Sequence, residues 1–133
     1  MSKIVATVQK IQNIDNLHIV TFLCDDVELK MMSLDINVNI KEGKKVLLNT
    51  KPSSISLARD LQGQISISNK LDVKIISILK GELLSIITLD FKGFQLESLL
   101  TSVDVEKMNL REGEELNALI KASEIYIVEC LDE

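Results

Sequence analysis

Hydrogen-bond donors without negative charge gather at three places in the second half of the sequence. They are Ser66, Ser68 and Asn69 in SISN, Thr101 and Ser102 after an apolar run, and Lys121 and Ser123 on either side of Ala122 in LIKASEIYI. Hydroxyl and amide groups donate hydrogen bonds, and a lysine adds positive charge. Such a set suits a tetrahedral oxyanion. Each residue alone is typical of a turn, a helix cap or a strand end, so the set acts together only if the fold assembles it.

The lysine of LIKASEIYI is the least ordinary of these residues. Residues 119–127 read as one apolar strand, and a buried ammonium group is costly in a strand unless it is paired. Two interpretations are open from this stretch alone. Either Lys121 lies near a strand end and reaches solvent along its aliphatic stem, or an anion and a neighbouring repeat or subunit complete its environment.

Catalytic patterns are absent from the sequence. It contains no GxSxG, P-loop, HExxH or GxGxxG motif. A Ser-His-Asp triad can use only His18, and many carboxylates lie in polar segments such as CDDVE and REGEE, where solvated charge is typical. Cys24 and Cys130 are far apart and form no ligand cluster with His18, which predicts buried free thiols in a reducing compartment. We therefore expect no enzymatic activity and no directly bound metal cation.

Composition narrows the possible partners. The chain has 133 residues, 46% of them hydrophobic, enough for one ordinary domain or two very small ones. Its 15 basic and 20 acidic residues give a net charge of −5, and only 3% of residues are aromatic, which argues against nucleic-acid binding. The most apolar region is interrupted by Lys74, Lys80 and Glu82 and does not read as a membrane span. MSKIVATVQK lacks the apolar region of a secretory signal, so we expect a cytoplasmic protein.

The sequence repeats itself. SKIVATVQKIQNIDNLHIVTFLCDDVEL aligns without a gap with NKLDVKIISILKGELLSIITLDFKGFQL, and Lys70 follows Lys3 by 67 positions. Further on, NIKEGKKVLLNTKPSSISL aligns with NLREGEELNALIKASEIYI, and Lys121 follows Lys51 by 70 positions. We predict two copies, 1–60 and 66–133, the second longer by three residues between about 97 and 109.

Each copy reads as a set of strands. KLDVKIISI and FQLESLL alternate apolar and polar residues, the period of a half-buried strand. KEGKK and REGEE are polar turns around a glycine. Thr101 stands three residues before Asp104, a capping-box pattern that predicts a short helix in the second copy, whereas SLDINVNI predicts a shorter or irregular connection in the first. The expected fold is all-β, with two small five-stranded barrels that pack against each other and against further copies of the chain.

Three segments of the second copy resemble a known domain. They are SISNKL, the glycine turn of NLREGEEL, and ALIKASEIYI. These segments are similar to the Mop domain, the molbindin type of TOBE domain, and the first copy extends the resemblance over essentially the whole chain. The resemblance implies OB-like β-barrels that bind molybdate or tungstate at interfaces between barrels and assemble into dimers, trimers or hexamers.

The resemblance also assigns residues by position. The opening motif of the family falls on 66–69, its threonine on Thr101, a later basic position on Lys107, and its lysine motif on 121–123, with Lys51 as the first-copy equivalent. The motif's arginine is Ser68 here, and Arg59 in LARDLQG is a second candidate for that role. The implied oxyanion-binding set is Ser66, Ser68, Asn69, Thr101, Lys107, Lys121, Ala122, Ser123 and Lys51.

These expectations combine into one hypothesis. The chain would be a cytoplasmic molybdate- or tungstate-binding protein for oxyanion storage or homeostasis, with molybdate or tungstate as its ligand. The alternative is an oxyanion-sensing regulatory or interaction module that partners a molybdate-transporter ATPase or a regulator. In both cases we expect a homo-oligomer, a trimer or else a dimer, that binds neither nucleic acid nor a membrane.

Overall fold

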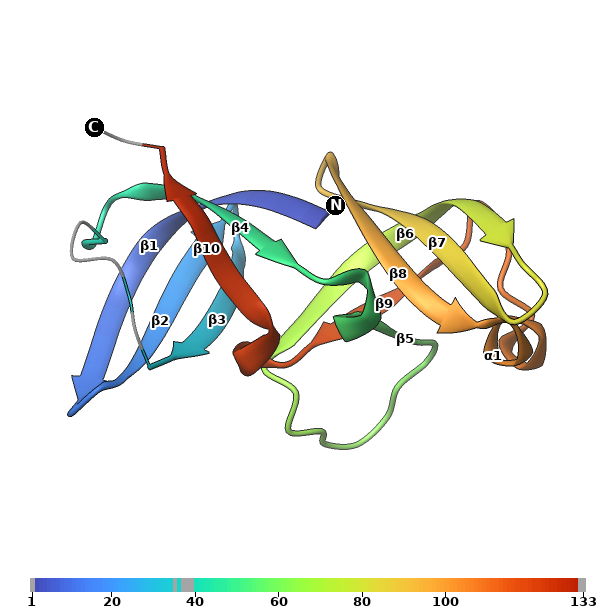
Figure 1. The fold of residues 1–133 in the computed structure, drawn as a ribbon, viewed down its shortest axis with the longest axis horizontal. Coiled ribbons are helices and arrows are strands. Elements are labelled where there is room, and N and C mark those ends of the chain that lie inside the picture. The colour runs from blue at the N-terminus through green and yellow to red at the C-terminus, as the bar shows by residue number, and fades with distance from the viewer. Residues whose placement is uncertain (1, 35, 37–39, 132–133) are drawn as a thin grey trace.

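The computed structural model describes residues 2–34, 36 and 40–131 and shows two five-stranded antiparallel sheets side by side along the long axis (Figure 1). The first sheet has the order β10-β4-β1-β2-β3, with β1 at Ser2–Ile14, β2 at Leu17–Cys24, β3 at Val27–Ser33, β4 at Lys45–Thr50 and β10 at Ile125–Cys130. The second has the order β5-β9-β6-β7-β8, with β5 at Ser56–Ala58, β6 at Asn69–Lys80, β7 at Leu84–Phe91, β8 at Phe94–Thr101 and β9 at Glu115–Ile120. Each sheet curls into a small OB-like barrel, so the predicted fold class is confirmed.

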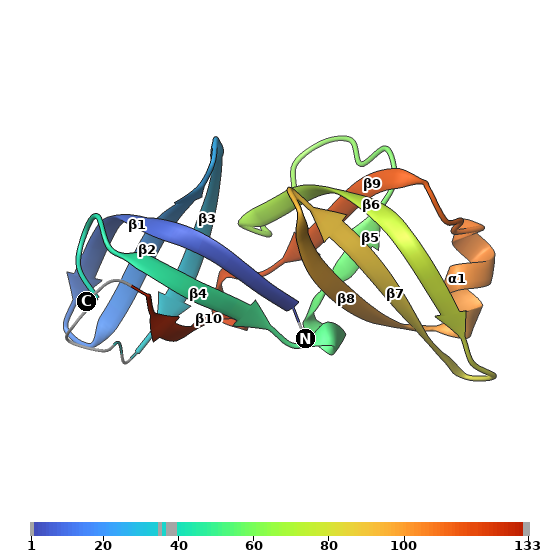
Figure 2. The same ribbon diagram turned by 90° about the horizontal axis from the view of Figure 1, so that it is seen from above.

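The two repeats exchange their last strands. β10 belongs to the second repeat but pairs with β4 of the first, and β5 belongs to the first repeat but pairs with β9 of the second. Two short 3₁₀ helices, η1 (Pro52–Ser54) and η2 (Ala122–Glu124), connect one barrel to the other (Figure 2). We call the region around these two helices, where the barrels meet, the waist. Each barrel is therefore completed by a strand from the other repeat.

This exchange overturns the expectation that residues 119–127 form one strand. β9 ends at Ile120, and Ile125 begins a strand of the other sheet. Lys121 is the extended residue that precedes η2, and its side chain is exposed. The apolar residues on either side of it face two different barrels, so the lysine interrupts no single strand.

The alternating segments form strands as predicted. In β6 the side chains of Leu71, Val73 and Ile75 are buried while Lys70 and Asp72 between them are exposed. This alternation gives the strand one face toward the core. The core contains apolar side chains from both sheets, among them Phe22, Leu29, Phe91 and Leu96.

The glycine turns are equivalent in the two repeats. Gly43 and Gly113 have φ angles of 87° and 85°, in the left-handed region where a glycine avoids the strain of a side chain. The amide of Gly43 donates to the carbonyl of Val8 at 2.8 Å, and that of Gly113 donates to Ile75 at 2.7 Å. The register of β1 and of β6 shifts directly after these acceptors, so the repeats share their irregularities as well as their strands.

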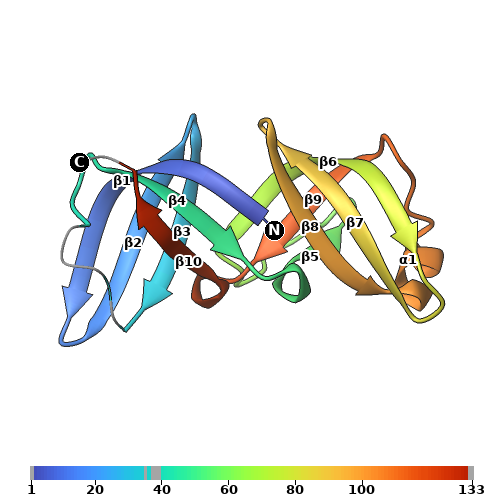
Figure 3. The same ribbon diagram turned by 45° about the horizontal axis from the view of Figure 1, so that its top comes forward.

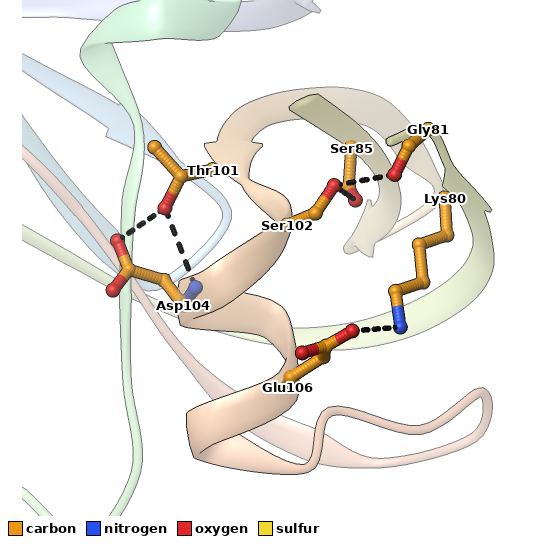
Figure 4. Close-up of polar contacts among 7 residues, drawn as sticks. All are labelled: Lys80, Gly81, Ser85, Thr101, Ser102, Asp104 and Glu106. Atoms are coloured by element: carbon orange, nitrogen blue, oxygen red, sulfur yellow. Dashed lines mark hydrogen bonds and ion pairs between the residues drawn. The ribbon is translucent and has the colours of Figure 1, made fainter. Parts of the chain in front are cut away.

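The predicted helix is present in the second repeat. α1 spans Ser102–Met108, and the hydroxyl of its N-cap Thr101 accepts a hydrogen bond from the amide of Asp104 at 3.3 Å (Figure 4). Ser102 fixes the helix to the neighbouring hairpin by donating to the carbonyl of Gly81 at 2.7 Å. In the first repeat the expected irregular connection includes 35 and 37–39, which lie outside the described residues. None of the described helices is long and apolar enough to cross a bilayer.

The exchanged strands predict that the repeats fold together. We expect fragment 1–62 alone to give no cooperative unfolding transition, because it lacks β10 and leaves the edge of β4 unpaired. Fragment 63–133 retains β10 but has no partner for it. Mixing the two fragments should restore the circular dichroism spectrum of the intact chain and a cooperative thermal transition. Two fragments that each fold alone and do not bind each other would contradict this account.

Candidate functional site

The opening segment and the lysine motif of each repeat meet at the waist. Asn69, at the start of β6, pairs with Ile120, which directly precedes Lys121. In the first repeat Ser2 pairs with Thr50, which directly precedes Lys51. The structure thus brings Asn69, the last residue of SISN, beside the start of the lysine motif.

Asn69 clamps its repeat to the edge of the other barrel. Its side chain is fully buried, its Oδ1 accepts from the backbone amide of Lys30 at 2.7 Å, and its Nδ2 donates to the backbone carbonyl of Lys30 at 2.9 Å. Lys30 lies on β3, an edge strand of the first sheet, so the side-chain amide acts as a strand partner for one residue. The amide of Asn69 therefore positions the segment, a role that the sequence did not indicate.

Ser2 makes the equivalent contact from the first repeat. Its hydroxyl accepts from the backbone amide of Glu97 on β8 at 2.8 Å and lies 3.5 Å from the carbonyl of the same residue. Glu97 follows Lys30 by 67 positions, as Asn69 follows Ser2. The waist therefore has approximate twofold symmetry in its backbone contacts.

The two lysine motifs are joined to each other. Thr50 Oγ1 donates to the backbone carbonyl of Glu124 at 2.7 Å, and Ser54 Oγ donates to the Glu124 carboxylate at 3.1 Å. Ser54 and Glu124 are themselves equivalent, 70 positions apart, so this contact links the two 3₁₀ helices directly. The register of the repeat was the signal that could have indicated this pair from the sequence.

The remaining motif side chains are open to solvent. Lys121, Ser123, Ser66 and Ser68 are exposed, Ala122 is half-buried, and Lys51 is exposed on η1's side of the waist. Ser123 also lines a hollow of about 250 Å³, whose other walls include β10, Ile36, Ile40 and the Met31–Ser33 segment of β3. The second-repeat motif thus opens toward the first barrel.

Thr101 and Lys107 lie elsewhere. Thr101 pairs with Leu84 at the end of β8, whereas the waist holds the opposite end of the second barrel, and α1 covers the end remote from the first barrel (Figures 1 and 3). Thr101 Oγ1 donates to the Asp104 carboxylate at 2.8 Å, and this carboxylate complements the positive end of the short helix (Figure 4). Lys107 is exposed in the last turn. Within one chain these two residues do not join Lys121.

Arg59 is engaged away from the lysine motif. Its guanidinium donates to the Glu114 carboxylate, and this hydrogen bond raises the pKa of Arg59 and lowers the pKa of Glu114. Glu114 precedes β9, whereas Lys121 follows the end of that strand. Arg59 therefore supplies no charge to the waist in this structure.

Neither cysteine forms a disulfide. Cys24 is buried, and desolvation raises its pKa, whereas Cys130 is half-buried rather than buried. Neither thiol belongs to the waist contacts described above.

Comparison with known proteins finds a domain match in the second repeat. Residues 65–127 match the TOBE domain. The chain is 33% identical over 87 residues to the molybdenum import ATP-binding protein ModC of Brucella abortus, and equally to that of Brucella melitensis. The match includes 65% of this chain and 24% of each relative, so the chain spans only about a quarter of their length.

A solved structure extends the likeness to the whole chain. The cytoplasmic molybdate-binding protein ModG, in a form with molybdate bound, superposes with a TM-score of 0.85 at 22% identity and covers 94% of this chain and 93% of that one. This likeness establishes a common fold of two barrels. Residues 65–127 are thus similar to a TOBE domain, within a chain that folds as two similar barrels.

The buried clamp yields a stability prediction. Asn69→Leu should lower the free energy of unfolding by about 1–3 kcal/mol, because it leaves the amide and carbonyl of Lys30 without partners. Urea denaturation monitored by circular dichroism measures this change. Asn117→Leu is the matched control, since the Asn117 amide bonds the exposed Asp72 carboxylate. An equal loss in both variants would contradict the role assigned to Asn69.

Proposed function

We propose that this chain reversibly binds molybdate or tungstate and stores or buffers the anion in the cytoplasm, without catalysis. The observation that supports the proposal is the pairing of Asn69, the last residue of SISN, with Ile120, which directly precedes Lys121. ModG with molybdate bound, and the molybdenum import protein ModC, support the choice of anion. Reversible capture needs only preorganised donors.

The waist offers the donors that such an anion requires. Lys121 provides positive charge, and the hydroxyls of Ser66, Ser68 and Ser123 donate without adding a fixed negative charge. The backbone of η2 is held at both ends by strand pairing. The strand before it, β9, pairs with β6 in one sheet, and the strand after it, β10, pairs with β4 in the other. Preorganisation of this kind lowers the entropy lost on binding.

A second copy of the chain would complete the site. Thr101 and Lys107 lie at the far end of the second barrel, so they reach a waist only if it belongs to another subunit. That end exposes apolar side chains, including Leu79 at 70%, Leu83 at 79% and Val103 at 58%, and such clusters favour association. A homo-oligomer, either a trimer or a dimer, would bury them.

Regulation of a transporter is the second candidate function. The similarity to ModC favours it, since the matched segment is part of a molybdenum import ATP-binding protein. In that case the chain would bind a transport ATPase or a regulator in an anion-dependent way. Light scattering of the purified chain with and without molybdate, followed by titration with ModC, distinguishes storage from regulation.

The two lysine motifs should contribute unequally. Lys121→Ala should weaken molybdate binding about tenfold to a hundredfold, the loss of about 1.5–3 kcal/mol expected for a hydrogen bond to a charged group. Lys51→Ala should cost much less, because Pro52 follows Lys51 where Ala122 follows Lys121, and Ser2 stands at the position of Asn69. Thr101→Val should have an intermediate effect. Calorimetric titration with molybdate and tungstate measures all three, and thermal melts check the folding. Equal losses from the two lysines would contradict the assignment.

Oligomerisation is tested separately from affinity. Sedimentation equilibrium at micromolar concentration, with and without molybdate, should show a trimer or a dimer. Leu83→Glu should shift the distribution toward the monomer, because it places a charge within the apolar end of the second barrel. Lys41→Glu, in an exposed turn, is the control. A wild-type monomer under both conditions would refute a site shared between subunits.

A further inference from the structure

The candidate site of each repeat rests on an edge strand of the other barrel. Asn69 bonds the backbone of Lys30 on β3, and η2 packs against the same strand. In the reciprocal arrangement Ser2 bonds the backbone of Glu97 on β8, and η1 packs against β8. Strands β3 and β8 therefore form one wall of the second-repeat and first-repeat sites, respectively.

Strands β3 and β8 carry side chains of opposite charge at the residues whose backbones Asn69 and Ser2 bind. Lys30 and Glu97 occupy equivalent positions, 67 residues apart. Lys30 is exposed on its edge strand, and its ammonium group has no ion-pair partner among the described residues. Its main chain is fixed by the fully buried Asn69. Two hydrogen bonds thus hold the main chain of Lys30 next to Asn69, and the side chain of Lys30 extends from this fixed point.

We propose that Lys30 of the first repeat is a specificity-determining residue of the second-repeat anion site, to which it adds a second positive charge beside Lys121. This inference rests on the proposed function. At the equivalent position, the wall of the first-repeat site carries an acidic residue, Glu97. The waist therefore has one favoured oxyanion site and one disfavoured site per chain, and part of the favoured site comes from the other repeat.

Charge, and not packing, should control the effect of this residue. Lys30→Arg should bind molybdate as the wild type does, Lys30→Met about threefold to tenfold more weakly, and Lys30→Glu more weakly still. These factors correspond to one charge acting on a dianion through a water-exposed path. The backbone bonds to Asn69 do not involve the Lys30 side chain, so all three variants should keep the wild-type melting temperature.

Lys10→Met is the matched control. Lys10 is an exposed strand lysine on β1, eight residues from Ser2 and so about 26 Å along the strand from the waist at about 3.3 Å per residue. Calorimetric titration of each variant with molybdate at low and high salt gives the affinity and its salt dependence. Lys30→Met should reduce the salt dependence, because one fewer charge attracts the anion, whereas Lys10→Met should leave it unchanged.

The outcomes separate this inference from the proposed function. If the wild type binds no molybdate or tungstate, the proposed function fails. If the wild type binds and Lys30→Met equals Lys10→Met in affinity and salt dependence, the role of Lys30 is refuted while the binding site stands. If Lys30→Arg loses as much affinity as Lys30→Met, the charge argument is refuted. An affinity for molybdate that falls from Lys30→Arg to Lys30→Met to Lys30→Glu supports the proposal.

Discussion

The pairing of each repeat's last strand with the sheet of the other repeat is the constraint on which the waist depends. β10 reaches β4 only if the chain leaves β9 at Ile120 and turns through η2, and β5 reaches β9 through the matching turn η1. Both lysine motifs therefore sit on turns with a hydrogen-bonded strand at each end. Turns held in this way lose less conformational entropy when they bind a ligand than free loops do.

The backbone at the waist is nearly symmetric, and its side chains are not. Ser2 and Asn69 make equivalent contacts with edge strands, but only the asparagine is both donor and acceptor through separate atoms. Ser54 faces its own equivalent, Glu124, across the contact between η1 and η2. A duplicated scaffold with unequal charges can keep one binding site while the other serves mainly as its support.

Residues close together in sequence were sufficient to predict the individual strands and the helix. They were not sufficient to predict which strands pair with each other. Alternation predicted β6 and β8, and the Thr101–Asp104 pattern predicted α1, because each depends on residues close in sequence. The exchange of β10 was not predicted, since the apolar residues on both sides of Lys121 do not specify which sheet each side joins. Likewise the sequence did not show that Thr101 lies at the far end of the barrel from Asn69. That separation follows from the strand register, which only the fold reveals.

Anomalous X-ray diffraction from crystals grown with molybdate, recorded near the molybdenum absorption edge, would locate the bound anion. We expect an anomalous peak at the waist, within hydrogen-bonding distance of Lys121 or Ser123 and beside the SISN segment, with a weaker peak or none at the Lys51 motif. A sole peak away from both lysine motifs, or a peak of equal strength at each, would contradict this expectation.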